Sequence, residues 1–181
     1  VKNIYLRAFL GGVIVIVLTL IVGDESYNGI GTDIIASALG EGKAPAWGFL
    51  WKIAFTAVTI GFGFKGGEIV PTFFVGATFG CVVGPLLGMD PSFAAAVGLV
   101  ALFCGVINCP VASFTLSVEL FGGEGVIFFG IASVIGYMLS GYNGLYSSQT
   151  IVYSKLKAQY INVRTNAYHA GEPVAPFQQG G

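Results

Sequence analysis

The chain has 181 residues, of which 55% are hydrophobic and only 9% are charged, and its formal net charge is -1. A charged fraction this far below the ~25% usual for soluble domains leaves too few polar side chains to cover a water-facing surface. Disordered proteins have the opposite composition, and a chain without a basic patch is not expected to bind nucleic acid. The composition therefore predicts an integral membrane protein.

The charged residues mark the ends of the expected membrane segments. A charged side chain in hydrocarbon costs roughly 2.5 to 3.5 kcal/mol, so the spans should lie in the uncharged stretches 8–23, 53–64, 69–89, 91–118 and 125–154. A straight span needs about 20 residues. The first two stretches are short by this measure, unless Arg7 and Lys52 snorkel at their ends. The segment 34–40 predicts a partial or surface helix.

Two of these stretches contain internal breaks. The stretch 91–118 is too long for one ordinary span and contains Asn108 and Pro110, which predicts two helices that meet near Asn108. The stretch 125–154 is divided by a strong turn signal at 141–144. We expect about seven or eight apolar helices of unequal length, several of them interrupted.

The segment most informative about chemistry is 61–71. Four glycines lie within the seven residues 61–67, which disfavours regular helix there, and Pro71 suits the first turn of a new helix. The run predicts a broken helix that restarts near Glu68. Irregular backbone at membrane depth occurs where it is buried in protein or lines an aqueous cavity. A helix N-terminus in such a place presents free amides and a positive partial charge, which bind anions.

Beyond this break, glycines recur at every fourth position on one helix face, at Gly76, Gly80, Gly84 and Gly88. This pattern of small residues lets a neighbouring backbone approach closely, and by itself it predicts tight helix packing. Pro85 is expected to kink or end the helix.

Three segments, in this order, resemble the CLC family of chloride channels and anion/proton antiporters. The run 66–71, followed by 74–80, is similar to a family signature in which a glycine turn precedes two anion-binding residues, a proline and a Gly-Ala helix. The segment 105–120 resembles a pair of family helices joined at a proline turn, and 143–148 resembles the start of the family's last helix, whose tyrosine hydroxyl points at the central anion. The likeness runs from about Arg7 to Lys157.

This resemblance implies the fold and the site. The expected fold is all-α and polytopic, the C-terminal inverted-repeat half of a CLC-type protein with broken, tilted helices. It implies an anion held by Gly67, Glu68, Ile69, Val70 and the hydroxyl of Tyr146, with Gly66, Gly67 and Pro71 forming the helix break. Apart from the resemblance, Tyr146 has the alternative of an interfacial residue, because tyrosine favours membrane boundaries.

Glu68 departs from the chloride-handling members, which place apolar residues here, and resembles the fluoride-exporting branch. An ionised carboxylate repels chloride, whereas a protonated one can donate a hydrogen bond to fluoride. Glu68 is therefore expected to set selectivity or to carry protons, and the alternative is that it only caps its helix. The expected function is fluoride/proton antiport, with a chloride channel or chloride/proton exchanger as the alternative.

The organisation follows from the same resemblance and from the charges. We expect a transmembrane domain at 1–157 and a cytoplasmic, disordered tail at 158–181. The positive residues Lys155, Lys157 and Arg164 place this end in the cytoplasm, with the rest in a bacterial inner membrane. Because the sequence opens with Val1 and shows no signal peptide, we expect a fragment that lacks an N-terminal half. The complete protein is expected to be a homodimer that binds fluoride or chloride and protons.

Other classes of protein are disfavoured. An intramembrane serine protease needs a nucleophile in a glycine frame and a histidine within the membrane, but the serines lack that frame and the single histidine, His169, lies in the tail. We therefore do not expect an enzyme. Cys81, Cys104 and Cys109 are odd in number and lie in apolar runs, which predicts core thiols rather than a metal site, and no cofactor is expected. A scaffold subunit would account for the packing glycines but not for a glutamate in a glycine break.

Overall fold

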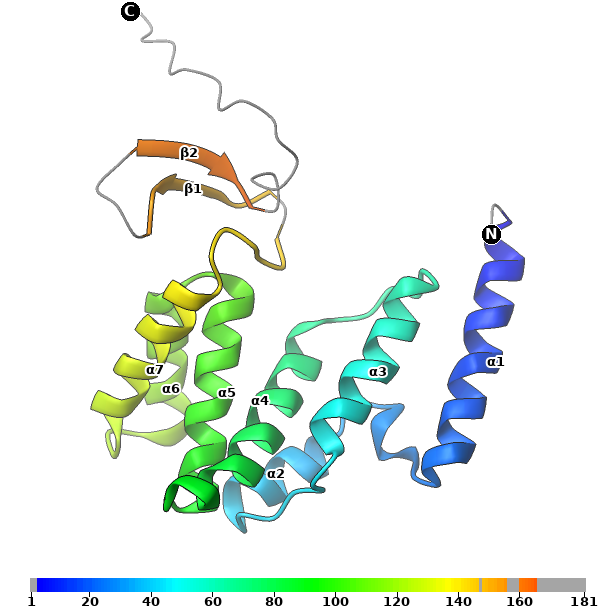
Figure 1. Cartoon of the computed structure of the whole chain (residues 1–181), viewed down its shortest axis with the longest axis horizontal. Helices are drawn as coiled ribbons and strands as arrows, with labels where there is room; N and C mark the ends of the chain where they lie inside the picture. Colours follow the sequence, from blue (N-terminus) through cyan, green and yellow to red (C-terminus); the bar gives the residue numbers. More distant parts are fainter. Residues whose placement is uncertain (1–2, 147, 156–159, 166–181) are drawn as a thin grey trace, which may run out of the picture.

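The computed structural model describes residues 3–146, 148–155 and 160–165. Within them the helices are α1 (Ile4–Val22), η1 (Glu25–Tyr27), α2 (Thr32–Gly40), α3 (Gly48–Gly61), α4 (Ile69–Val83), η2 (Gly84–Leu87), α5 (Pro91–Ile107), α6 (Pro110–Phe121) and α7 (Val126–Leu139). Strands β1 (Thr150–Tyr153) and β2 (Tyr160–Arg164) form one antiparallel hairpin beyond the helix ends (Figure 1). The predicted helical fold is confirmed, with this hairpin as an addition.

The helices differ in length, as the spacing of the charges predicts. Two helical stretches, Ile4–Val22 and Ile69–Leu87, are long and apolar enough to cross a membrane, whereas the other four apolar helices have 10–17 residues. Asn108 closes α5 in the left-handed conformation, and Pro110 opens α6, so the predicted joint is confirmed. Pro85 lies in η2, where α4 ends, as predicted.

The core is built where α4 crosses α5. A Cβ added to Gly76 would meet the carbonyl oxygen of Gly98 at 2.7 Å, and one added to Gly80 would collide with the carbonyl of Ala94. The glycine face of α4 therefore serves close helix packing, as predicted. Helix α2 also joins this core, because Ala38 is fully buried with Ala77 and Ala95 around it. The helix has nine residues and Ala38 is its one buried residue, which agrees with the prediction of a partial or surface helix.

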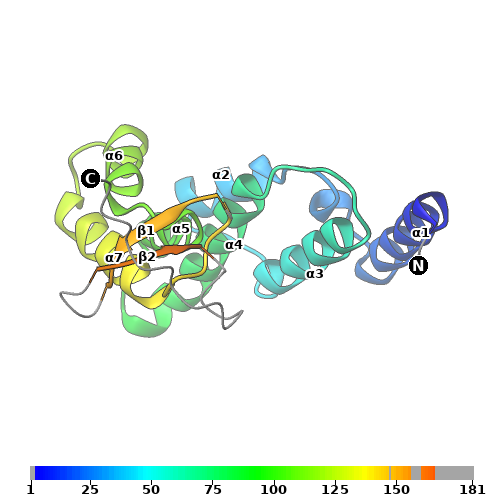
Figure 2. The same cartoon turned by 90° about the horizontal axis from the view of Figure 1, so that it is seen from above.

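Helix α1 lies at one edge of the molecule (Figures 1 and 2). Gly11 is its one buried residue, and a Cβ there would meet the Cβ of Phe62 at 2.6 Å. Most of its large apolar side chains are exposed, including Tyr5, Phe9 and Leu20. A continuous apolar face of this kind is covered by lipid or by further protein.

Tyr146 does not open a helix, so that prediction is wrong. It lies in the irregular segment between α7 and β1, where the N–H of Gln149 donates to the carbonyl oxygen of Tyr146 at 3.0 Å. The following residues, Thr150 to Tyr153, are β-branched or aromatic, which favours a strand over a helix. They pair with β2, where Thr150 lies opposite Arg164.

The predicted disordered tail begins too early. Residues 160–164 form β2, and the side chain of Thr165 is buried with its hydroxyl donating to the carbonyl oxygen of Gln149 at 2.8 Å. The prediction that 158–181 is disordered is therefore wrong for this strand. His169 and the remainder of the tail, 166–181, lie outside the described residues.

Lys155 links the hairpin to the ends of α5 and α7. Its ammonium group donates to the carbonyl oxygen of Tyr137 at 2.6 Å, to the hydroxyl of Ser140 at 2.9 Å and to the side-chain oxygen of Asn108. It also lies 3.9 Å from the centre of the Tyr137 ring. Burial lowers the pKa of Lys155 from 10.5 to about 8.

This lowered pKa predicts a pH dependence of stability. Between about pH 8 and pH 10.5 the unfolded chain keeps the proton on Lys155 while the folded chain releases it. The free energy of unfolding should therefore rise with pH across this window, and the cost of burying the charge is present in full below it. We expect the melting temperature of the unmodified protein to rise relative to that of Lys155→Met between about pH 7.5 and about pH 10. If the melting temperatures of the two proteins change with pH in the same way, the lowered pKa of Lys155 is contradicted.

Candidate anion-binding site

The break between α3 and α4 lies where the glycines predict it. Helix α3 ends at Gly61, Gly63 takes a left-handed conformation with φ 87°, and α4 restarts at Ile69 with Glu68 as its N-cap residue. Figure 1 shows α4 starting below the upper ends of α3 and α5, so the loop 62–68 returns along the bundle before the new helix begins. The predicted helix break is confirmed, and its irregular backbone lies alongside the helices rather than beyond them.

The backbone amides of this segment are available to a ligand. Among the described residues, no acceptor is found for the N–H groups of Gly66, Gly67, Glu68, Ile69 and Val70. Pro71 has no N–H, and the next amide, that of Thr72, donates to the carbonyl oxygen of Glu68 at 3.2 Å. Unpaired amides at the first turn of a helix are the usual backbone donors to bound anions.

The carboxylate of Glu68 does not cap α4. Glu68 occupies the N-cap position, but its side chain accepts no hydrogen bond from the first turn, and the residue is half-buried. Its carbonyl oxygen instead accepts the hydroxyl of Thr72 at 2.8 Å. The alternative in which Glu68 caps α4 through a side-chain hydrogen bond is therefore not supported.

A cavity of about 410 Å³ opens beside the break. Gly66, Gly67, Val70 and Pro71 line one side of it, and Lys52 with residues of α1, η1 and α3 lines the other. Four of the residues predicted from the sequence thus share one cavity, three of them from the helix-break motif.

Lys52 is the feature of this cavity that sequence reasoning missed. Its side chain is only 2% exposed, and its ammonium group donates to the carbonyl oxygens of Tyr27 and Gly29 and lies 5.0 Å from the centre of the Phe74 ring. The prediction that it snorkels to a membrane boundary is wrong, because two carbonyl groups and an aromatic face replace water inside the fold. The one sequence signal was a lysine in an apolar helical segment.

Arg7 adds a second positive group near the break. Its guanidinium packs against the left-handed residue Gly63, where an added Cβ would meet Cζ of Arg7 at 2.9 Å. The ion pair between Lys43 and Glu41 lies elsewhere, on the surface, and it is the one salt bridge among the described residues. No carboxylate among the described residues forms an ion pair with Arg7 or Lys52, so both contribute positive charge near the glycine break.

Tyr146 is not brought into this cavity. It lies in the segment 140–149, its side chain is 48% exposed, and it is absent from the cavity lining. That segment follows the upper ends of α5 and α7 in Figure 1. The described chain therefore brings Gly66, Gly67, Val70 and Pro71 together with Lys52. Glu68, Ile69 and Tyr146 do not line this cavity.

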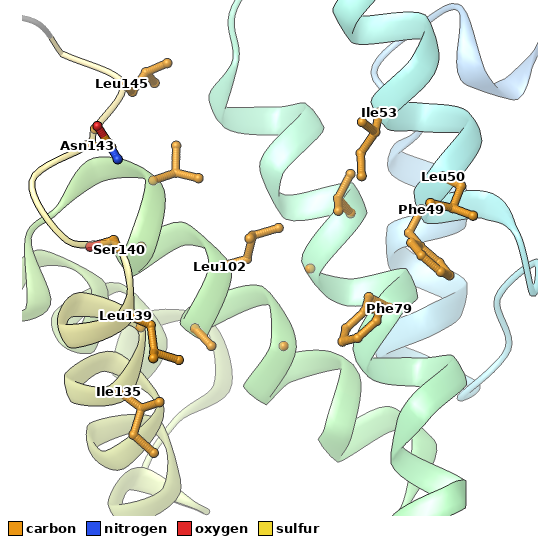
Figure 3. A pocket seen from close by; sticks show the side chains of 18 residues that line it. Phe49, Leu50, Ile53, Phe79, Leu102, Ile135, Leu139, Ser140, Asn143 and Leu145 are labelled. Atoms are coloured by element: carbon orange, nitrogen blue, oxygen red, sulfur yellow. The ribbon is translucent and has the colours of Figure 1, made fainter. Parts of the chain in front are cut away.

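A larger groove of about 910 Å³ runs between α3 and α4 on one side and α5 and α7 on the other. Figure 3 shows its lining, in which Phe49, Phe79, Leu102 and Leu139 are prominent and Ser140 and Asn143 lie at one end. None of its 18 lining residues is charged, so it presents an apolar surface suited to lipid or to another helix and not to a bare anion.

The interrupted helices, the apolar outer faces and the backbone break define a polytopic membrane protein. Residues 1–141 match the sequence profile of the voltage gated chloride channel family. The chain is 38% identical over 156 residues to a "Chloride/fluoride channel protein" of Pseudomonas syringae pv. tomato. This match covers 83% of this chain and 34% of the relative. It is 30% identical over 89 residues to an uncharacterized protein of Methanocaldococcus jannaschii, covering 49% of this chain and 22% of that protein.

The chain also resembles a solved structure, the crystal structure of a CLC-type fluoride/proton antiporter, with a TM-score of 0.75 and 28% identity. The match covers 80% of this chain and 36% of the antiporter. The chain therefore belongs to the CLC family of membrane channels and transporters, as its motifs predict. It spans about a third of the length of the Pseudomonas relative and of the antiporter.

Proposed function

We propose that this chain forms the C-terminal repeat half of a CLC-type anion transporter and that the complete protein exports fluoride in exchange for protons. The observation that carries the proposal is the restart of α4 at Ile69, where the amides of residues 66–70 have no acceptor among the described residues and the Glu68 carboxylate does not cap the helix. Because the chain spans about a third of its relatives, we propose that transport requires this chain together with the remainder of such a fold.

In the proposed site, a dehydrated anion accepts hydrogen bonds from the amides of Gly67, Glu68, Ile69 and Val70. The hydroxyl of Tyr146 completes the coordination once the rest of the fold is in place. The positive charges of Lys52 and Arg7 raise the local concentration of anions at the entrance. Each of these groups is a donor or a cation, as an anion site requires.

Glu68 supplies the selectivity of the proposed site. While the Glu68 carboxylate is ionised, it repels both fluoride and chloride. Chloride is the larger ion and the weaker hydrogen-bond acceptor, so its hydrogen bonds in the site do not offset this repulsion. Once protonated, the carboxyl group donates a short hydrogen bond to fluoride, which is a strong acceptor. Binding of fluoride is thereby linked to protonation of Glu68. Exchange also requires that Glu68 takes up its proton on the side where fluoride leaves and releases it on the side where fluoride enters, and we propose that the complete fold imposes this order. The names of the Pseudomonas relative and of the antiporter support fluoride as a substrate, and the former also names chloride.

We further propose a homodimer in a bacterial inner membrane with the C-terminus in the cytoplasm. Helix α7 presents an exposed apolar face that includes Ile131, Ile135 and Leu139, and either lipid or a second copy covers it.

The test of function is efflux from liposomes that contain the complete protein and are loaded with fluoride or with chloride. We expect fluoride efflux accompanied by proton uptake, and equal fluoride and chloride rates without proton movement would favour a chloride channel instead.

A further inference from the structure

We propose that Asn108, at the joint between α5 and α6, is a positioning residue that fixes where Tyr146 lies. This inference rests on the proposed function, in which the Tyr146 hydroxyl is a ligand of the anion. Asn108 acts through the backbone on both sides of Tyr146, and Asn108 itself does not contact the anion.

The backbone at Asn108 indicates that its side chain is used. Asn108 has φ 59°, and it is the one non-glycine residue with positive φ among those that the structure describes. Glycine is the usual residue in this conformation, and asparagine tolerates it less well. The side chain is also buried, with 4% exposed. A residue held in a costly conformation with a buried carboxamide points to a requirement for that group.

Three side-chain partners of Asn108 lie in the segment that leaves α7, and a fourth, Lys155, lies after β1. Its side-chain amide donates to the carbonyl oxygens of Asn143, at 2.8 Å, and Gly141, at 3.5 Å. Its side-chain oxygen accepts the hydroxyl of Ser140 at 3.2 Å and the ammonium group of Lys155. Its carboxamide therefore holds the segment that leaves α7 and does not pair with the backbone released at Pro110.

Tyr146 itself is anchored through its neighbours. On one side, the N–H of Leu145 donates to the carbonyl oxygen of Val106 at 2.8 Å. On the other, the side-chain amide of Gln149 donates to the carbonyl oxygen of Asn108 at 3.3 Å, and the N–H of Gln149 donates to the carbonyl oxygen of Tyr146 at 3.0 Å. Because the Tyr146 side chain is 48% exposed, packing of its ring does little to place it. The backbone anchors at the end of α5 do so instead.

The test measures the fluoride KM, the maximal rate and the melting temperature of the complete transporter in liposomes. Asn108→Gly allows the left-handed backbone and removes the side chain with its carboxamide. Tyr146→Phe removes the proposed ligand, and the double variant reports whether the two residues act as a unit. Gln149→Met breaks the other anchor, which gives a second route if Asn108→Gly does not fold. Thr115→Ala is the control, because its exposed hydroxyl donates to the carbonyl oxygen of Val111 in its own helix and, among the described residues, to no other group.

We expect Tyr146→Phe to raise the fluoride KM by about tenfold, because this variant loses one hydrogen bond to a charged group. Asn108→Gly should raise it by about fivefold, Gln149→Met by about twofold, and the double variant no further than Tyr146→Phe alone. Thr115→Ala should leave it unchanged.

A normal KM for both Asn108→Gly and Gln149→Met, beside a raised one for Tyr146→Phe, would overturn the positioning role while leaving the proposed site intact. A lowered melting temperature without a change in KM would assign Asn108 to stability alone, with the same consequence. A normal KM for Tyr146→Phe would overturn the proposed role of Tyr146 and the inference together.

Discussion

Replacing Glu68 by glutamine is expected to remove the preference for fluoride and the coupling to protons in the complete transporter. Glutamine has nearly the same size but never carries a charge, so it neither repels chloride nor takes up a proton. A charge-assisted hydrogen bond contributes about 1.5 to 3 kcal/mol. We therefore expect the ratio of fluoride to chloride efflux to fall by about tenfold or more, since 1.4 kcal/mol corresponds to a factor of ten.

The matched control for this prediction is Glu119→Gln. Glu119 lies at the exposed end of α6, away from the glycine break, and its replacement removes the same charge. Its liposome efflux should match that of the unmodified protein. If Glu68→Gln and Glu119→Gln behave alike in both ion selectivity and proton uptake, Glu68 has no role in transport.

The second large effect is expected on stability, from Gly80→Ala. An added Cβ would collide with the carbonyl of Ala94 and lie 3.0 Å from Cα of Ala95, so α4 and α5 must separate or shift. Overpacking of this kind costs about 1 to 3 kcal/mol, because the obstacle is backbone and not the end of a flexible side chain. We expect a clearly lowered melting temperature in detergent.

Gly12→Ala provides the comparison for the packing prediction. Gly12 lies within α1, and nothing lies within 4 Å of a Cβ added there. Alanine has a higher helix propensity than glycine by up to about 1 kcal/mol, so this variant should be as stable as the unmodified protein or slightly more so. Equal destabilisation by the two substitutions would show that the α4–α5 contact is looser than described.

Local sequence signals were sufficient wherever one residue type decides the backbone. The glycines of 61–67 disfavour helix and Pro71 favours a new one, so the break and the restart of α4 at Ile69 were predictable. Asn108 before Pro110 likewise predicted the joint between α5 and α6. The regular spacing of Gly76, Gly80 and Gly84 predicted a close crossing, although it did not identify α5 as the partner.

The features that escaped prediction depend on contacts between distant segments. Lys52 is buried because it donates to the carbonyl groups of Tyr27, in η1, and of Gly29, which follows η1. The sequence around Lys52 does not predict that these carbonyl groups lie close to it. The strand that follows Tyr146 is stabilised by pairing with β2, which the resemblance to a helical ending did not anticipate. The side-chain amide of Asn108 likewise donates to carbonyl groups more than thirty residues away, which the residues around it do not predict.

The central claim is that backbone amides at the glycine break bind the anion, and a fluoride titration followed by nitrogen-15 NMR tests it most directly. With glycine, glutamate and isoleucine labelled in the complete transporter, we expect saturable shifts at the amides of Gly67, Glu68 and Ile69, weakened in Glu68→Gln. The same titration should leave the amides of Gly12 and Glu119 unmoved. Saturable fluoride binding with no change at the three amides of the break would contradict the account.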